Sequence, residues 1–150
     1  MPNHITNKLT ISGVAKDIDA VIEFVNGEET VFDFDHIIPE PPGVDWYQWR
    51  IDNWGTKWNS YEAEQTDDDS FRFLTAWMTP EPVIKELSAR FPGVSIYVEY
   101  ADEDFGFNCG WYRYRRGKCV DRLDCIGGSE QAMDFAADVL EYDPRKEGDW

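Results

Sequence analysis

The stretch Ser70–Tyr100, SFRFLTAWMTPEPVIKELSARFPGVSIYVEY, determines the fold because it predicts a strand, a helix and a second strand in succession. Residues 70–78 alternate with the period of two that is typical of a strand, and one face carries Phe71, Phe73, Thr75 and Trp77. Thr79 and Pro80 are typical of the N-cap and the first position of a helix. The apolar residues that follow recur at helical spacing: Val83, Ile84, Leu87 and Phe91. Residues 94–100 then alternate again.

The chain before this stretch predicts three further elements. Residues 7–12 alternate as a strand, and residues 15–25 have the apolar stripe of a helix. Residues 60–66 predict a strand that turns back at residues 67–69 to pair with residues 70–78. The predicted order is strand, helix, strand, strand, helix, strand, which is the split β-α-β arrangement of a ferredoxin-like α+β domain.

A tryptophan-rich insert lies between the first helix and the second strand. Residues 46–58 contain four of the seven tryptophans of the chain: Trp46, Trp49, Trp54 and Trp58. Only Trp54 and Trp58 are one helical turn apart, so we expect irregular structure with a short helical turn, packed on a sheet face. An indole suits either a buried anchor or an exposed surface that docks a partner. The position in a small domain favours the buried role, and the docking role is the alternative.

A hairpin and a last helix follow the core. The hairpin is expected over residues 109–115 and 118–126, and the helix over residues 129–142. Because no linker or repeat interrupts the chain, we expect one domain, 1–150. Its parts are a core over residues 1–126, an acidic helix over residues 129–142 and a loose tail over residues 143–150.

Composition limits the classes of partner. Thirty acidic residues against fourteen basic ones give a net charge of -16, which repels the phosphates of nucleic acids and anionic membranes. Charge therefore argues against nucleic acid and membrane, and it favours a protein with a basic surface. With no apolar run near the length of about 20 residues that spans a bilayer, and no signal peptide, we expect a cytoplasmic protein. The oligomeric state is not predicted.

Several segments carry a resemblance to a known family. The most specific is NWGTKWN at residues 53–59. The others are Met1–His4 leading into Asn7–Gly13, Thr75–Trp77 before the helix at Pro80, Tyr100-Ala101 and Gly106–Gly110. Together they resemble the YubB-type proteins of phages and conjugative plasmids, over roughly residues 1–118. The resemblance implies a ferredoxin-like α+β fold and an origin in a bacterial mobile element, and it brings no catalytic residues.

Motifs of catalysis are scarce. The sequence has no P-loop, HExxH or GxSxG motif. Asp33, Asp35 and His36 could gather a divalent ion, although a strand with alternating acids has the same sequence. Cys109 with a distant histidine could form a thiol site, but the three cysteines (Cys109, Cys119 and Cys125) are more typical of reduced structural thiols. We therefore expect a non-catalytic protein without a metal or cofactor.

Two charged segments are candidate binding sites. The hairpin sequence WYRYRRGK, residues 111–118, interleaves bases with aromatics, as RNA-binding sheets do. The favoured alternative is that its arginines pair with neighbouring carboxylates or keep an edge hairpin soluble. The candidate nucleic-acid contacts of the hairpin are Tyr112, Arg113, Tyr114, Arg115, Arg116 and Lys118. The last helix carries carboxylates about every 6 Å along one ridge, close to the phosphate spacing of a DNA strand. The residues of this acidic ridge are Glu130, Asp134, Asp138 and Glu141, with Glu147 and Asp149 as an extension.

The leading hypothesis is a phage or plasmid accessory protein that binds a host protein through the acidic ridge and exposed tryptophans. An inhibitor of host defence or a mimic of DNA would fit this description. A solvated helix face explains the acidic ridge equally well. The alternative function is an RNA or single-stranded nucleic-acid-binding module that uses the sheet and the hairpin. Arg113 and Arg115 are expected on one face of it, and Tyr112 and Tyr114 on the other.

Overall fold

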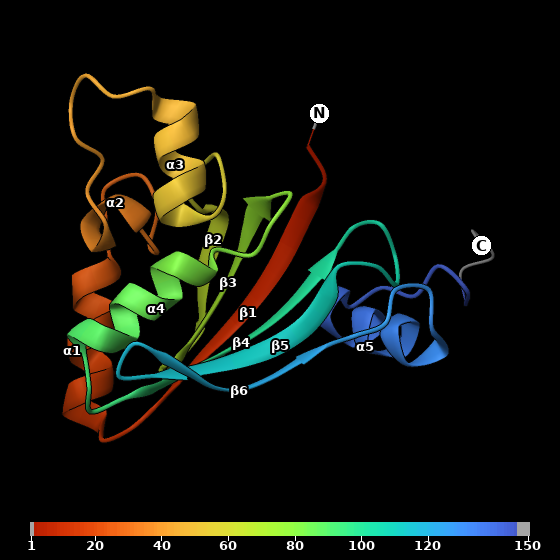
Figure 1. The fold of residues 1–150 in the computed structure, drawn as a ribbon. Helices are drawn as coiled ribbons and strands as arrows, with labels where there is room; N and C mark the ends of the chain where they lie inside the picture. The colour runs from red at the N-terminus through yellow and green to blue at the C-terminus, as the bar shows by residue number, and fades with distance from the viewer. Residues whose placement is uncertain (1, 147–150) are drawn as a thin grey trace.

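A computed structural model describes residues 2–146 of the chain. Within them, six strands and five helices form an α+β fold (Figure 1). The strands are β1 (His4–Ser12), β2 (Tyr61–Asp67), β3 (Ser70–Ala76), β4 (Ser95–Asp102), β5 (Cys109–Arg115) and β6 (Lys118–Asp124). The helices are α1 (Ala15–Val25), α2 (Phe34–Ile37), α3 (Trp46–Trp54), α4 (Glu81–Arg90) and α5 (Glu130–Leu140).

The strands form one antiparallel sheet in the order β2-β3-β1-β4-β5-β6. The first four strands of this order are those of a ferredoxin-like domain, which confirms the predicted fold class. The hairpin of β5 and β6 then extends the sheet beyond β4. None of the helices in residues 2–146 is long and apolar enough to cross a membrane.

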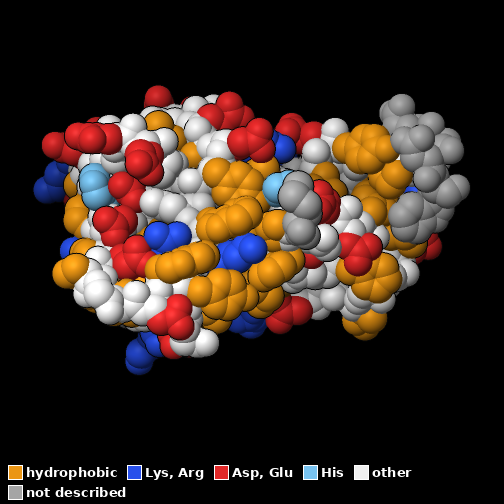
Figure 2. Space-filling view, turned by 90° about the horizontal axis from the view of Figure 1, so that it is seen from above, with side chains coloured by type: hydrophobic (Ala, Val, Ile, Leu, Met, Phe, Trp, Pro, Cys, Tyr) orange, Lys and Arg blue, Asp and Glu red, His pale blue; other side chains and the backbone are white. Residues whose placement is uncertain are grey.

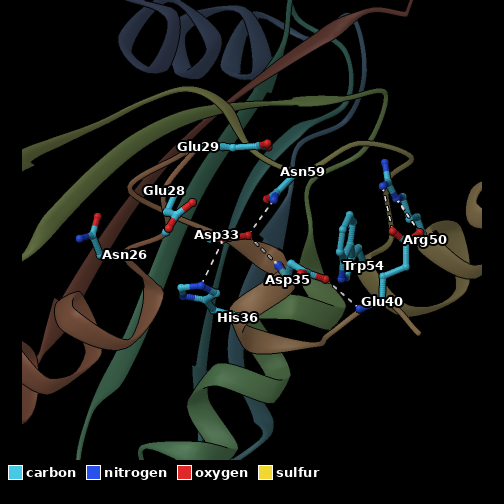
Figure 3. A pocket seen from close by; sticks show the side chains of 11 residues that line it. Asn26, Glu28, Glu29, Asp33, Asp35, His36, Glu40, Arg50, Trp54 and Asn59 are labelled. Carbon is cyan, nitrogen blue, oxygen red and sulfur yellow. Dashed lines mark hydrogen bonds and ion pairs between the residues drawn. The ribbon is translucent and has the colours of Figure 1, made fainter. Parts of the chain in front are cut away.

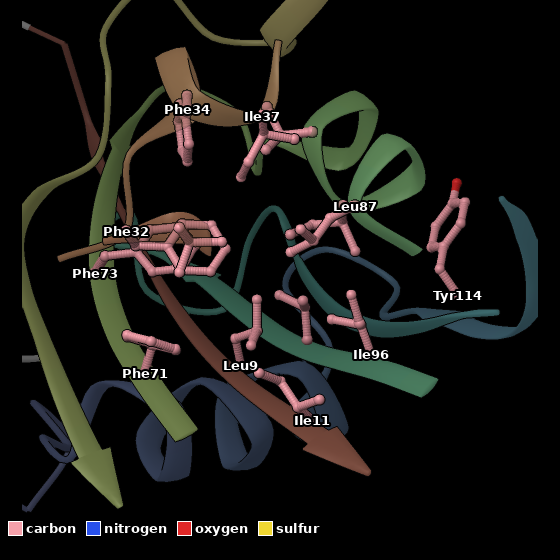
Figure 4. Close-up of a cluster of buried hydrophobic side chains, with 14 of the residues drawn as sticks. Leu9, Ile11, Phe32, Phe34, Ile37, Phe71, Phe73, Leu87, Ile96 and Tyr114 are labelled. Carbon is pink, nitrogen blue, oxygen red and sulfur yellow. The ribbon is translucent and has the colours of Figure 1, made fainter. Parts of the chain in front are cut away.

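The main core lies between the sheet and the helices α1, α2 and α4 (Figures 1 and 4). Alternate side chains of the strands supply one side of it, as the period of two requires. Its members from the strands include Leu9, Ile11, Phe71, Phe73 and Ile96. A smaller core lies on the other face, where α5 packs on β4 and β5. That face is covered only in part, because α5 is the single helix that contacts it among the described residues.

The prediction for the start of α4 was wrong in detail. Thr79 makes no capping bond, and Pro80 occupies the N-cap position instead. The Thr79 hydroxyl donates to Asn7 Oδ1 at 2.8 Å and lies 2.6 Å from the Tyr112 hydroxyl. Asn7 and Tyr112 are fully buried, so their polar atoms need a partner that the core does not otherwise supply.

The prediction for the tryptophan insert was also wrong. Its first part is a regular helix, α3, which ends at Gly55 with φ of +78°, so Trp54 and Trp58 do not share a helix. This helix packs against α4 rather than on the sheet. The sheet face beneath is already occupied, because Phe32 stacks on Phe73 with 4.8 Å between ring centroids.

The end of the chain is tied to α5 as far as it is described. Ser129 caps α5 by accepting from the Ala132 N–H at 3.1 Å, and Glu141 at φ of +56° ends the helix earlier than expected. Arg145 then pairs with Asp143 at 2.9 Å and with Asp134 at 3.0 Å. The rest of the predicted tail, with Glu147 and Asp149, lies outside the described residues.

Candidate functional site

The four tryptophans of the insert divide into buried and exposed side chains. Trp54 is 1% exposed, and its indole N–H donates to the Ile38 carbonyl at 2.9 Å. Trp49 is half-buried and meets Trp54 edge to face. Trp46 and Trp58 are 48% and 37% exposed, and they therefore have the exposure that a docking role requires. Trp54 is a buried anchor of the insert, whereas Trp46 and Trp58 lie at its surface.

Exposed rings gather around two cations into one aromatic patch, made of Trp46, Tyr47, Arg50, Lys57, Trp58 and Trp77 (Figure 2). The Lys57 ammonium lies 4.5 Å from the Trp58 ring centroid and 4.3 Å from that of Trp77. The Arg50 guanidinium lies 5.2 Å from the Trp46 ring and is held by Glu40 in two hydrogen bonds of 3.0 Å. These cation–π contacts fix the rings without burying them.

Trp77 belongs to the aromatic patch, although the sequence predicted it on the same strand face as Phe71 and Phe73. It is 42% exposed, because β3 ends at Ala76 and Trp77 adopts φ of +66°. Its N–H donates to the Asn3 carbonyl at 2.9 Å, and its carbonyl accepts from Asn108 Nδ2 at 3.1 Å. A left-handed backbone costs a residue with a side chain about 1–3 kcal/mol, and such strain gathers at functional sites. These two contacts hold the indole outward against Lys57.

The border of the aromatic patch is acidic. Tyr61 meets Trp58 edge to face at 6.0 Å, and its hydroxyl lies 2.6 Å from His4 Nδ1. Burial, together with the nearby carboxylates of Glu103 and Glu62, raises the pKa of Tyr61 to about 12, so this hydroxyl stays neutral. Exposed carboxylates near the rings are Glu62 and Glu103, which act on Tyr61, and Asp45, which precedes Trp46 in the chain.

A cavity of about 750 Å³ adjoins the aromatic patch and contains the residues considered for a metal (Figure 3). Asp33 Oδ1 accepts from the Asp35 N–H at 2.9 Å and from Asn59 Nδ2 at 2.8 Å, so it caps α2. His36 Nε2 lies 3.6 Å from Asp33 Oδ2. The segment is a capped helix, and the alternative of an acidic strand was wrong. Within residues 2–146, no cluster of three or more potential ligands has a metal-binding arrangement.

Cys109 has the environment of a structural thiol. It is buried under α5, and its thiol lies 3.6 Å from the Ala132 carbonyl. Burial and the neighbouring Cys125 thiol raise the pKa of Cys109 to about 12. A thiol nucleophile needs the opposite shift, because the thiolate is the reactive form.

The hairpin tyrosines proposed as nucleic-acid contacts face the core. Tyr112 is fully buried and Tyr114 is 6% exposed, with its hydroxyl bonded to the Glu81 carboxylate. Neither ring can stack on a base, so this part of the prediction was wrong. Arg113 and Arg115 point to the other face, as expected, and both are exposed. The two remaining candidates, Arg116 and Lys118, are also exposed.

The acidic ridge is exposed along its whole length, at Glu130, Asp134, Asp138 and Glu141. Half of it is neutralised by bases from other elements. Asp134 pairs with Arg145 at 3.0 Å, and Glu141 lies 3.9 Å from Lys8 Nζ. These pairs interrupt the row of charge that would imitate a phosphate backbone.

Comparisons with known proteins place the chain in a family. The protein named "Uncharacterized protein YubB" from Escherichia coli (strain K12) is 39% identical over 83 residues, 51% of this chain and 56% of that protein. This chain thus spans about half the length of that curated relative. A crystal structure of the protein api92 from Yersinia pseudotuberculosis has a TM-score of 0.49 at 23% identity, over 65% of this chain and 40% of that one. A model of the ferredoxin-like domain in Api92-like proteins matches residues 53–143, and the chain belongs to that family.

Proposed function

We propose that the protein is a non-catalytic binding module that docks a partner protein on the aromatic patch. The observation that carries this proposal is the pair Trp58 and Trp77, held on either side of the Lys57 ammonium while more than a third of each indole stays exposed. Tryptophan, tyrosine and arginine are the residues that dominate binding energy at protein interfaces. Rings that are already fixed lose little side-chain entropy when a partner binds.

The border of the aromatic patch suggests the chemistry of the partner. Exposed carboxylates flank the rings, and the chain carries a net charge of -16. Such a surface fits a protein with an apolar centre and a basic rim, and the overall negative field speeds their encounter. The carboxylates of the acidic ridge that have no ion pair within residues 2–146, Glu130 and Asp138, add to that field from another side of the molecule. The YubB resemblance favours a protein of the bacterial host as the partner, with the chain itself encoded by a phage or plasmid.

A capture experiment with matched variants tests the proposal. The purified protein is immobilised and exposed to a bacterial lysate at low and high salt, and bound proteins are quantified by mass spectrometry. We expect a basic protein that is captured by the wild type and lost with Trp58→Ala combined with Trp77→Ala. Capture should also weaken as salt rises, because salt screens the interaction between the acidic rim and the basic partner.

Ile126→Ser is the matched control, because Ile126 is 79% exposed and lies outside the aromatic patch. This variant should capture the same protein as the wild type. Equal capture by the tryptophan variant and the wild type would refute docking on the patch. Melting curves of all variants establish that they are folded.

A further inference from the structure

The sheet face that α5 leaves open carries two aromatic side chains besides the buried hairpin tyrosines. Tyr97 on β4 and Trp111 on β5 are half-exposed neighbours, with 5.6 Å between their ring centroids. The Arg113 guanidinium lies 5.1 Å from the Tyr97 ring centroid. Because these residues alternate with the buried Val98 and Tyr112, they point away from the main core. The open face therefore presents two adjacent rings and a stacked cation.

The cations beside these rings have no carboxylate partner among residues 2–146. Arg113, Arg115, Arg116 and Lys118 are all exposed, and none forms an ion pair within the part of the chain that the structure describes. Asp121 stands opposite Arg113 in the strand pairing and still makes no ion pair with it. Pairing with neighbouring carboxylates, one of the two structural explanations for these arginines, therefore does not occur among the described residues. Four positive charges lie together on a chain that is otherwise strongly acidic.

We infer that this surface, the hairpin face of Tyr97, Trp111, Arg113, Arg115, Arg116 and Lys118, binds single-stranded nucleic acid. Unpaired bases would stack on Tyr97 and Trp111, and the basic side chains would contact the phosphates. Neighbouring strands lie about 4.8 Å apart, so rings on β4 and β5 suit successive bases. Stacking of this kind tolerates any base, so little sequence preference is expected.

The groups next to the rings include carboxylates, Glu99 and Asp121, as well as the cation of Arg113. The Tyr97 hydroxyl donates to Glu99 at 3.1 Å. Burial and that carboxylate raise the pKa of Tyr97 to about 12, so the ring carries no charge that would repel a phosphate. The net charge of -16 acts from further away and is screened beyond about 10 Å at 0.1 M salt. Contacts between the basic side chains and phosphates release counterions and weaken as salt rises, so binding should be stronger at low salt than at physiological salt.

Fluorescence anisotropy of a labelled single-stranded RNA or DNA of about 12 nucleotides tests the inference. We expect saturable binding at about 25 mM salt, with a slope of log affinity against log salt near -3 if all four cations contact phosphates. Arg113→Glu combined with Arg115→Glu should abolish binding. Trp111→Leu keeps an apolar side chain but removes the ring, and it should weaken binding about ten-fold.

Lys16→Glu combined with Lys85→Glu is the matched control. It changes the net charge by the same amount at two exposed positions on α1 and α4, which cover the opposite face of the sheet. This variant should keep most of the affinity. Equal losses in the two charge variants would attribute binding to net charge alone and overturn the inference. Absence of binding by the folded wild type at low salt, or full affinity of Trp111→Leu, would overturn it as well.

Discussion

At the scale of single residues, Asn7, Thr79 and Tyr112 form a buried chain of hydrogen bonds. Asn7 Nδ2 also donates to Thr75 Oγ1 at 2.9 Å, so the chain of hydrogen bonds joins β1, β3, the segment before α4 and β5. The Thr79 hydroxyl donates to Asn7, which leaves the Tyr112 hydroxyl as the donor to Thr79. The positions lie far apart in the sequence, and no local pattern indicates that they meet.

Removing the Tyr112 hydroxyl should therefore cost stability with little change of shape. Tyr112→Phe leaves the ring in place but deprives a buried oxygen of its donor, which costs about 1–2 kcal/mol. Urea unfolding should show a lower midpoint with an unchanged slope. Tyr47→Phe is the control, because Tyr47 is 42% exposed and the loss of its hydroxyl should cost little stability. Equal midpoints for both variants would contradict the buried network.

At the scale of elements, helix α3 carries one buried tryptophan, Trp54, and one exposed tryptophan, Trp46. Trp54→Ala should lower the free energy of unfolding by about 3–5 kcal/mol, because it empties a fully buried site against Phe34. Trp46→Ala should cost less than about 1 kcal/mol, since it loses little beyond its contact with Arg50. Urea unfolding of the two variants makes this comparison. Similar losses would show that the insert is uniformly structural.

The edge strand β6 is held to α4 by Arg122. This side chain bonds Glu81 at 2.9 Å and Asp124 at 3.2 Å, and Asp124 also accepts from the Tyr100 hydroxyl at 2.8 Å. The bonds from Arg122 and then from Tyr100 lower the pKa of Asp124 below its ordinary value of 3.8. A carboxyl with a lowered pKa in the folded state stabilises the fold at pH above its ordinary value. That contribution is lost as pH falls through the folded pKa.

Asp124→Asn should therefore make the free energy of unfolding depend less on pH in the acidic range. The wild type should lose stability relative to the variant as pH falls below about 4, and the two should run parallel near neutral pH. Urea midpoints measured across this range give the difference. Glu64→Gln, an exposed carboxylate on β2 with no ion pair in the described residues, is the control and should follow the wild type. A variant with an unchanged dependence on acidic pH would refute this role of Asp124.

Some elements of the fold could be predicted from the sequence alone, and others could not. The alternation of β1, β3 and β4 and the stripe of α1 follow from burial on one side of a sheet or helix, so these were predicted within a few residues. The outward turn of Trp77 was not, because it depends on Asn3 and Asn108 from distant segments. Seven tryptophans signal a site, but only the fold decides which of them are exposed.

At the scale of the whole molecule, charge is unevenly distributed. The composition gives one number, a net charge of -16, and on that basis nucleic acid was an improbable partner. The fold gathers four basic side chains without an ion pair among residues 2–146 on the β5–β6 hairpin, while Lys8 and Arg145 pair with carboxylates of the acidic ridge. Whether a basic side chain is paired depends on contacts between distant segments, such as those of Lys8 with Glu141 and of Arg145 with Asp134. Those contacts are invisible to composition and periodicity.

The excess of carboxylates should make the fold more stable as salt increases. Repulsion among them opposes the compact state, and the screening length falls from about 30 Å at 0.01 M salt to about 10 Å at 0.1 M. We expect Tm to rise by several degrees over about this range, even though salt also weakens individual ion pairs, because those pairs contribute little. The doubly substituted Lys16→Glu and Lys85→Glu variant is more acidic, and its Tm should rise more steeply. A Tm that falls with salt would mean that specific ion pairs outweigh the general repulsion.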